Sequence, residues 1–204
     1  MPDETIDAAP RAVAAIVDRI ETRLPPDGPS IIEAPLESTG AFGRYEGVPP
    51  QLELEDDGRN ATVLAPITYF GPEGMEWPVP TGAVCDGASI PQAFWTIIGG
   101  PFEGKYRNAS IVHDRYCVTK SRPWRVTHLM FWQAMRCSGV GAARAAVMYY
   151  AVRRFGPRWP DPGLEGFAAQ PVLSTDGLAA DADRIIDENL DPSAIDQLVE
   201  KREG

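Results

Sequence analysis

The sequence predicts an α+β fold in which a small antiparallel β-sheet packs against a layer of three helices. Short segments of alternating apolar and polar residues fill about residues 50–85, whereas helical patterns fill about residues 105–156. A hydrophobic content of 44% is that of a globular protein, and 204 residues suffice for one core with appendages. We therefore expect three regions: an N-terminal helix and linker at 1–30, the α+β core at 31–160, and an acidic, partly helical tail at 161–204.

The N-terminal region is predicted to contain an amphipathic helix at residues 10–23. Val13, Ile16, Val17 and Ile20 recur at helical spacing and form one apolar stripe. The proline- and glycine-rich segment 25–30 ends the helix. An isolated helix of this length is marginal in water, so it should dock on another part of the chain.

Three extended segments are predicted to build the sheet. Leu52 and Leu54 alternate with polar residues, which indicates a strand that is half buried on one face. Residues 61–70 form a second strand, in which Pro66 indicates an edge or a bulge because proline has no N–H for a central ladder. Residues 77–85 are a third, shorter extended segment.

Of the three helices in the layer, the first is expected to end near Val118, and the other two to span residues 126–138 and 142–155. A short extra helix is expected at 91–98. On the helix at 142–155, we expect Arg144, Arg153 and Arg154 to remain in solvent. In the tail, residues 181–190 and 192–203 can each form a short amphipathic helix.

Charge is distributed very unevenly along the chain. Residues 1–60 carry 13 acids and 5 bases, residues 61–160 carry 5 acids and 11 bases, and residues 161–204 carry 11 acids and 3 bases. The acidic flanks are either solvated surface that keeps the protein soluble or segments that fold back on the basic centre, and the centre can also meet an anionic partner. Nucleic-acid binding is not expected, because the arginines are spread over several helices and the net charge is −10.

The location expected from the sequence is the cytoplasm. The N-terminus is acidic and lacks the basic and apolar regions of a secretory signal, and no apolar run approaches the roughly 20 residues of a membrane span. Three cysteines without such a signal argue against a disulfide framework.

The polar residues that can carry chemistry gather in residues 77–128. His113 and Asp114 are neighbours on one helix, and Cys117 shares a helix face with His113 at i, i+4. If the next helix packs antiparallel, His128 can meet His113 across the interface, and Asp86 can complete the group from the preceding turn. Two imidazoles and carboxylates suit either a divalent metal ion or a general base oriented by a carboxylate.

Each of these residues also has a structural interpretation. Buried histidines are often satisfied by backbone groups. Asp86 and Ser89 can simply stabilise a tight turn by bonding local backbone groups. Cys117 is either a buried thiol, a zinc ligand or a nucleophile beside His113.

The order of these motifs resembles the domain of unknown function 1353 family of phage and prophage proteins. The similar segments are WPVPTGAVCDGASIP at 77–91, KYRNASIVHD at 105–114, RVTHLMF at 125–131 and VMYYAVRRFG at 147–156, within about residues 48–158. The resemblance implies polar site residues at Asp86, Ser89, His113, Asp114 and Arg125, with Tyr116 nearby. His128 stands where the family usually has an aspartate. The His-Asp-x-Tyr-Cys order is also similar to that of secreted phospholipases, whose disulfides and calcium loop are missing here.

The function expected from these residues is that of a phage- or prophage-derived hydrolase acting on an ester, a phosphoester or a cell-wall bond. His113 would be the general base or a metal ligand with His128 and Asp86, the carboxylates of Asp86 and Asp114 would assist it, and the basic centre would receive an anionic substrate. The alternative is a non-enzymatic accessory or virion-associated protein that binds a phage or host protein, with the His-Asp pair in a structural role.

Overall fold

The computed structural model describes residues 8–25, 40–56, 60–85, 104–161, 163 and 176–203. The elements in these residues confirm the α+β class. The helices are α1 (Ala8–Arg23), α3 (Arg107–Thr119), α4 (Trp124–Cys137), α5 (Ala142–Phe155), α6 (Leu178–Asp187) and α7 (Pro192–Glu203). The strands are β1 (Arg44–Glu46), β2 (Leu52–Leu54), β3 (Ala61–Val63), β4 (Ile67–Phe70), β5 (Glu76–Val79) and β6 (Val84–Cys85). The helix predicted at 91–98 lies outside the described residues.

The strands divide between two three-stranded antiparallel sheets, where the sequence led us to expect one. The first sheet has the order β1-β4-β5 and the second β2-β3-β6. The predicted strand at 61–70 is split into β3 and β4 at residues 64–66, which include Pro66. Because proline cannot donate a ladder hydrogen bond, the chain leaves one sheet here and enters the other.

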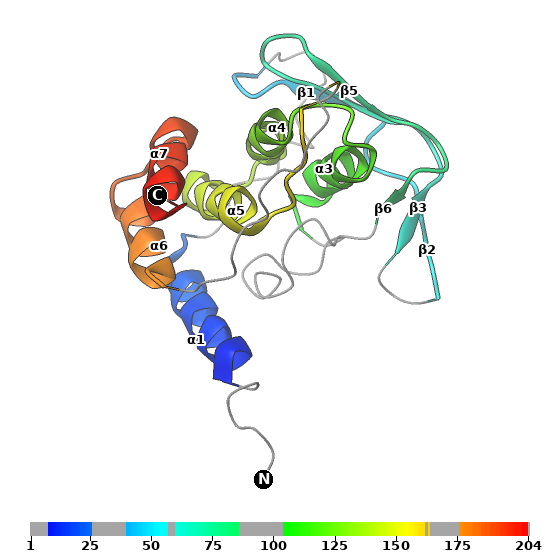
Figure 1. Ribbon diagram of the computed structural model, residues 1–204. Coiled ribbons are helices and arrows are strands. Elements are labelled where there is room, and N and C mark those ends of the chain that lie inside the picture. Colours follow the sequence, from blue (N-terminus) through cyan, green and yellow to red (C-terminus); the bar gives the residue numbers. More distant parts are fainter. Residues whose placement is uncertain are drawn as a thin grey trace.

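The helices form a layer beside the sheets. Helix α3 packs against α4, α4 against α5, and α3 also contacts β4, β5 and β6 (Figure 1). One hydrophobic core joins the helices to the first sheet. It contains Ile111 of α3, Phe131 of α4 and Tyr150 of α5 together with Tyr69 and Trp77 of the sheet. None of the helices in the described part of the chain is long and apolar enough to span a membrane.

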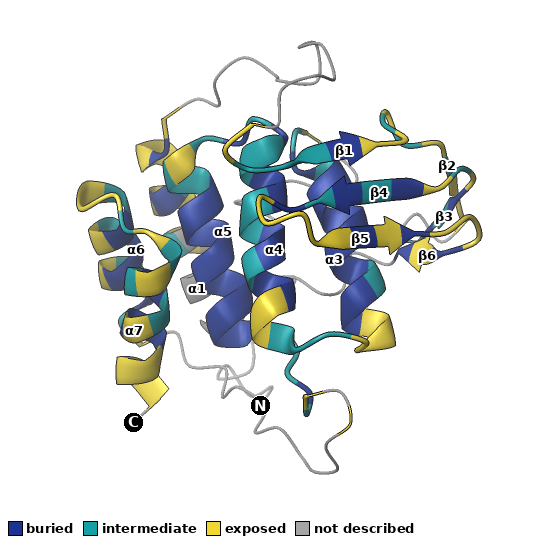
Figure 2. Ribbon diagram, turned by 90° about the horizontal axis from the view of Figure 1, so that it is seen from above, coloured by how far each residue is buried: buried dark blue, intermediate teal, exposed yellow. Residues whose placement is uncertain are grey.

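The C-terminal helices extend this core on the side away from the sheets. Figure 2 shows α6 and α7 beyond α5, and both contact α5, while α1 packs on α6. Helix α7 buries Ile195, Leu198 and Val199, and the tail therefore contributes to the core as well as to the surface.

The acidic C-terminal tail folds back on the basic centre through ion pairs. On α5, Arg153 binds Asp196 of α7 at 2.6 Å and Arg154 lies 3.5 Å from Asp181 of α6. Arg153 and Arg154 are 1% and 7% exposed, so the prediction that they remain in solvent was wrong. They can be buried because carboxylates from the tail, distant in sequence, accompany them.

Candidate metal centre

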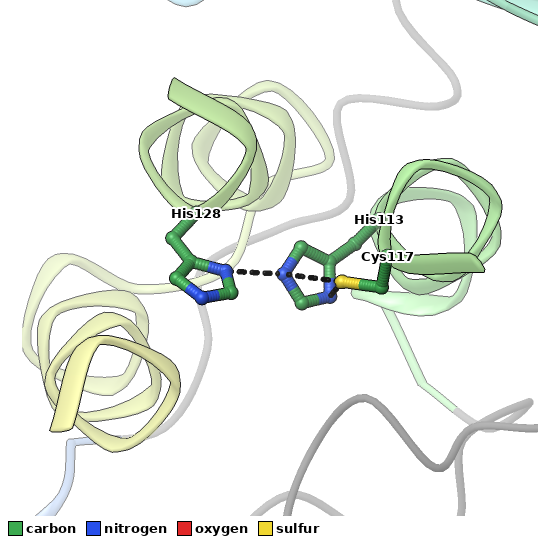
Figure 3. A group of neighbouring side chains, drawn as sticks. All are labelled: His113, Cys117 and His128. Atoms are coloured by element: carbon green, nitrogen blue, oxygen red, sulfur yellow. Dashed lines mark hydrogen bonds between the residues drawn. The ribbon is translucent and has the colours of Figure 1, made fainter. Parts of the chain in front are cut away.

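Helices α3 and α4 bring two histidines and one cysteine together between them. His113 Nε2 and His128 Nδ1 are 2.8 Å apart, and the Cys117 sulfur lies 3.6 Å from His113 Nε2 (Figure 3). One ligand atom from each residue can be chosen so that all lie within 4.8 Å of one another, the spacing of a group that can hold a metal ion. Cys117 and His113 share a face because they are one helical turn apart, and α4 supplies His128 from across the interface.

Aromatic rings enclose this His113–Cys117–His128 cluster. Phe131 stacks on the His113 ring with centroids 4.6 Å apart, while Trp124 and Trp159 present edges to His128 at 5.6 and 6.2 Å. Both histidines are 0% exposed and Cys117 is 7% exposed. The cluster is therefore almost completely shielded from solvent.

The hydrogen bonds assign the protons of the two rings. His128 Nε2 lies 3.2 Å from the carbonyl oxygen of Pro157, which can only accept, so this nitrogen carries the hydrogen. A neutral His128 then accepts at Nδ1, and His113 must donate from Nε2. His113 Nδ1 is left as an acceptor, 3.8 Å from the Cys117 sulfur, whose thiol can donate weakly. The result is a directed chain in which every ring nitrogen has a partner.

Burial keeps both imidazoles neutral. Removal from water lowers the pKa of His113 to about 3. Burial also lowers the pKa of His128 well below its ordinary value, helped by His113 and by the positive charges of Arg153 and Arg158. Neutral imidazole is the form that binds a metal ion.

The donor types of the cluster fit a zinc-class ion, and the side chains would have to shift to bind it. Tetrahedral zinc, with bonds of about 2.0–2.1 Å to nitrogen and about 2.3 Å to sulfur, holds ligand atoms about 3.3 Å (N to N) and about 3.6 Å (N to S) apart. The sulfur-to-His113 distance of 3.6 Å already matches, and the two rings would have to separate by about 0.5 Å from their 2.8 Å contact. The sulfur and His128 lie within 4.8 Å of each other, so this pair would have to close by up to about 1.2 Å. The Pro157 carbonyl orients His128 from behind, as outer hydrogen bonds commonly do for metal-binding histidines.

Comparison with known proteins places the cluster within a described family. Residues 61–152 match the family model "Protein of unknown function (DUF1353)". This part of the chain is similar to the DUF1353 family. The DUF1353 match contains His113, Cys117 and His128, and it ends before Pro157 and the acidic tail. The resemblance noted in the sequence is thereby confirmed for these residues.

Two curated relatives come from Sinorhizobium fredii. Uncharacterized protein y4jT is 47% identical over 119 residues, which cover 58% of this chain and 35% of the relative. Uncharacterized protein y4iH is 31% identical over 162 residues, which cover 78% of this chain and 65% of the relative. The chain thus spans about a third of one relative and just under two thirds of the other. No solved structure matches the chain.

Of the site residues predicted from the sequence, His113, Cys117 and His128 come together, and all three lie in the segment 61–152 that matches the DUF1353 family. Asp114 is 2% exposed but does not belong to the cluster found among the described residues. Asp86 and Ser89 lie outside the described residues.

Two further predicted residues have other contacts. Tyr116 donates to the Pro78 carbonyl at 3.4 Å and so ties α3 to β5. The side chain of Arg125 is 56% exposed and lies 3.8 Å from Glu200 of α7.

Sequence reasoning missed the Pro157 carbonyl and the roles of Trp124 and Trp159 as walls of the cluster. The position of a backbone carbonyl cannot be predicted from the type of residue that carries it. Nothing in the spacing of the tryptophans linked them to His128.

Proposed function

We propose that this chain is a metal-binding protein in which His113, Cys117 and His128 hold a zinc-class ion between α3 and α4. The observation that carries the proposal is the convergence of three donors, with His128 already oriented by the Pro157 carbonyl. Sulfur and imidazole ligands select zinc over magnesium or calcium, which prefer oxygen ligands. On binding, Cys117 would lose its proton, and His113 would bind through Nε2 with its proton moved to Nδ1.

The burial of the cluster favours a structural role for the ion. Both imidazoles are 0% exposed, and structural zinc sites are closed, whereas catalytic sites keep a position open to water. The ion would brace α3 against α4 in the DUF1353 core, and the function would then lie in binding a partner. This agrees with the accessory role considered from the sequence.

The test is the metal content of protein purified without chelator. By elemental mass spectrometry we expect close to one zinc per chain in the wild type. His113→Ala and Cys117→Ser each remove one of three ligands, so they should retain less than about a tenth of the metal, in line with the loss expected when a ligand or its support is removed. Cobalt substitution should add visible absorption bands in the wild type that Cys117→Ser loses.

The matched control is Cys137→Ser. Cys137 is a free thiol whose sulfur donates to the Gly43 carbonyl at 3.3 Å, outside the cluster, so its replacement should leave the metal content unchanged. Metal-free wild type that also fails to take up added zinc while folded would refute the proposal. Equal zinc loss in all variants would also refute it.

A hydrolase remains the second candidate. Three protein ligands leave one coordination position of a tetrahedral ion, which in catalytic sites holds the attacking water. Zinc-loaded protein would be assayed against ester, phosphoester and cell-wall substrates, and turnover that is lost in His113→Ala would favour catalysis. The motif resemblance also supports three further proposals. These are a phage origin, a location in the cytoplasm or in a virion, and a partner that is either an anionic substrate or a phage or host protein.

A further inference from the structure

Three guanidinium groups surround one tryptophan next to the cluster. The Cζ atoms of Arg125, Arg153 and Arg158 lie 4.6, 4.7 and 4.8 Å from the ring of Trp124. Trp124 is one helical turn before His128 on α4, and their rings are in edge contact at 5.6 Å. Three positive charges are thus held one aromatic ring away from the cluster.

Helix α7 supplies the negative charges that balance these arginines. Asp196 binds Arg153 at 2.6 Å, Glu203 pairs with Arg158, and Glu200 lies 3.8 Å from Arg125. The three carboxylates follow the spacing i, i+4, i+7 and so lie on one face of α7. Arg153 and Arg158 have side chains that are only 1% and 10% exposed, so water screens their charges poorly.

The same arginines are connected to the backbone that orients His128. Arg158 directly follows Pro157, whose carbonyl accepts from His128, and its guanidinium donates to the Arg153 carbonyl at 3.0 Å. The segment is fixed further by Trp159, whose ring nitrogen donates to the Arg122 carbonyl at 2.8 Å. The carboxylates of α7 can therefore affect the cluster in two ways. They act on it directly by electrostatics, and they act indirectly because the arginines they bind help to hold Pro157, which orients His128.

We propose that α7 regulates the metal affinity of the His113–Cys117–His128 cluster by neutralising Arg153 and Arg158 with Asp196 and Glu203. This inference rests on the proposed metal site. When α7 is docked, a cation can enter the cluster beside balanced charges. When its carboxylates are absent, Arg153 and Arg158 each lose one counter-charge and repel the incoming ion more strongly. A partner that draws these carboxylates away from the two arginines would then weaken metal binding.

The expected size follows from simple electrostatics. Arg158 Cζ lies 4.8 Å from the Trp124 ring, which lies 5.6 Å from the His128 ring, so the arginine charge is within about 10 Å of that ring. Binding of zinc with loss of the Cys117 proton adds one net charge, and one unbalanced charge at about 10 Å and an effective dielectric constant of about 20–40 weakens it roughly four- to fifteenfold. Coupling is reciprocal, so zinc should also protect α7.

The experiment measures zinc affinity by competition with a chromophoric chelator, on full-length protein. Glu203→Gln alone should raise the dissociation constant about fivefold or more, because it removes the carboxylate that pairs with Arg158. Asp196→Asn together with Glu203→Gln should raise it further. Adding Arg158→Gln to Glu203→Gln should restore most of the affinity, which would not happen if α7 merely supported the fold. Hydrogen exchange over residues 192–203 should slow when zinc is added.

The matched control is Glu188→Gln, directly after α6. Glu188 pairs with Arg184 at 3.0 Å, and that arginine has no part in the group around Trp124, so affinity should stay within twofold. If the wild type binds zinc but Glu203→Gln and the double variant do not differ from it, the regulation by α7 is refuted while the metal site stands. Failure of Arg158→Gln to restore affinity also refutes it. A folded wild type that binds no zinc refutes the metal site itself.

Discussion

At the scale of single residues, the histidines determine how the metal-free protein responds to acid. His113 has a pKa lowered to about 3, whereas an unfolded histidine titrates near about 6.5. Between about pH 6.5 and pH 3, the unfolded state therefore binds a proton at this histidine and the folded state does not. The contribution of neutral His113 to the free energy of unfolding is fully present above about pH 6.5 and is lost as the pH falls toward 3. In chelator, the free energy of urea unfolding should fall by about 1.4 kcal/mol per pH unit for each such histidine.

The variant His113→Gln isolates this effect, because glutamine does not titrate while carboxylates elsewhere still do. Between pH 6.5 and 4.5, the wild type should lose more stability than His113→Gln does. Parallel pH curves for the two proteins would contradict the neutral, buried assignment of His113.

The residue scale is also where the sequence predicted most of the cluster. Two histidines on consecutive helices, with Cys117 one turn after His113, implied that the three side chains meet if the helices pack antiparallel. The structure brings them together at hydrogen-bonding distance. The partner of His128 could not be predicted, because a carbonyl at Pro157 is placed by the course of the chain after α5 and not by a side chain.

At the scale of elements, a buried carboxylate joins α5, α6 and α7. Asp181 on α6 accepts from Tyr150 at 2.6 Å and from Arg202 at 2.7 and 3.0 Å, and Arg154 is also close. Asp181→Ala would leave these groups without their acceptor, and we expect a loss of about 3–5 kcal/mol in the free energy of unfolding by urea. Glu188→Ala, which removes an exposed pair at the C-terminal end of the same helix, should cost less than about 0.5 kcal/mol. Equal losses would show that Asp181 is not a joint of the three helices.

The elements themselves were largely predictable, whereas their grouping was not. Periodicity located α1, α4, α5 and α7 within about two residues, since apolar positions on a helix face repeat every turn. The division into two sheets depends on where the chain turns at residues 64–66, and Pro66 signalled an interruption without saying which strands pair across it. Strand pairing joins residues far apart in sequence, so local patterns do not determine it.

At the scale of the whole molecule, the acidic tail is part of the core. From the sequence alone, the charge pattern of the tail was equally compatible with a solvated appendage. Ion pairs such as Arg153 with Asp196 join residues that are distant in sequence, so the pattern does not reveal them. Helices α6 and α7 bury Leu178, Ala182, Ile185, Ile195, Leu198 and Val199. At about 1.5–3 kcal/mol for each large side chain, their burial contributes roughly 8–15 kcal/mol before entropy is counted. That is as large as the net stability of about 5–15 kcal/mol that is typical of a domain.

A chain that ends at residue 175 should therefore fail to fold cooperatively. It would expose the apolar side of α5 and leave Arg153 and Arg154 without their carboxylates. We expect loss of the sigmoidal urea transition and self-association in size-exclusion chromatography. A comparison with the full-length triple variant Asp196→Asn, Glu200→Gln and Glu203→Gln separates apolar burial from charge, since that variant keeps Ile195, Leu198 and Val199 and should still unfold cooperatively. A truncated chain with an unchanged unfolding midpoint would mean that the tail is an appendage after all.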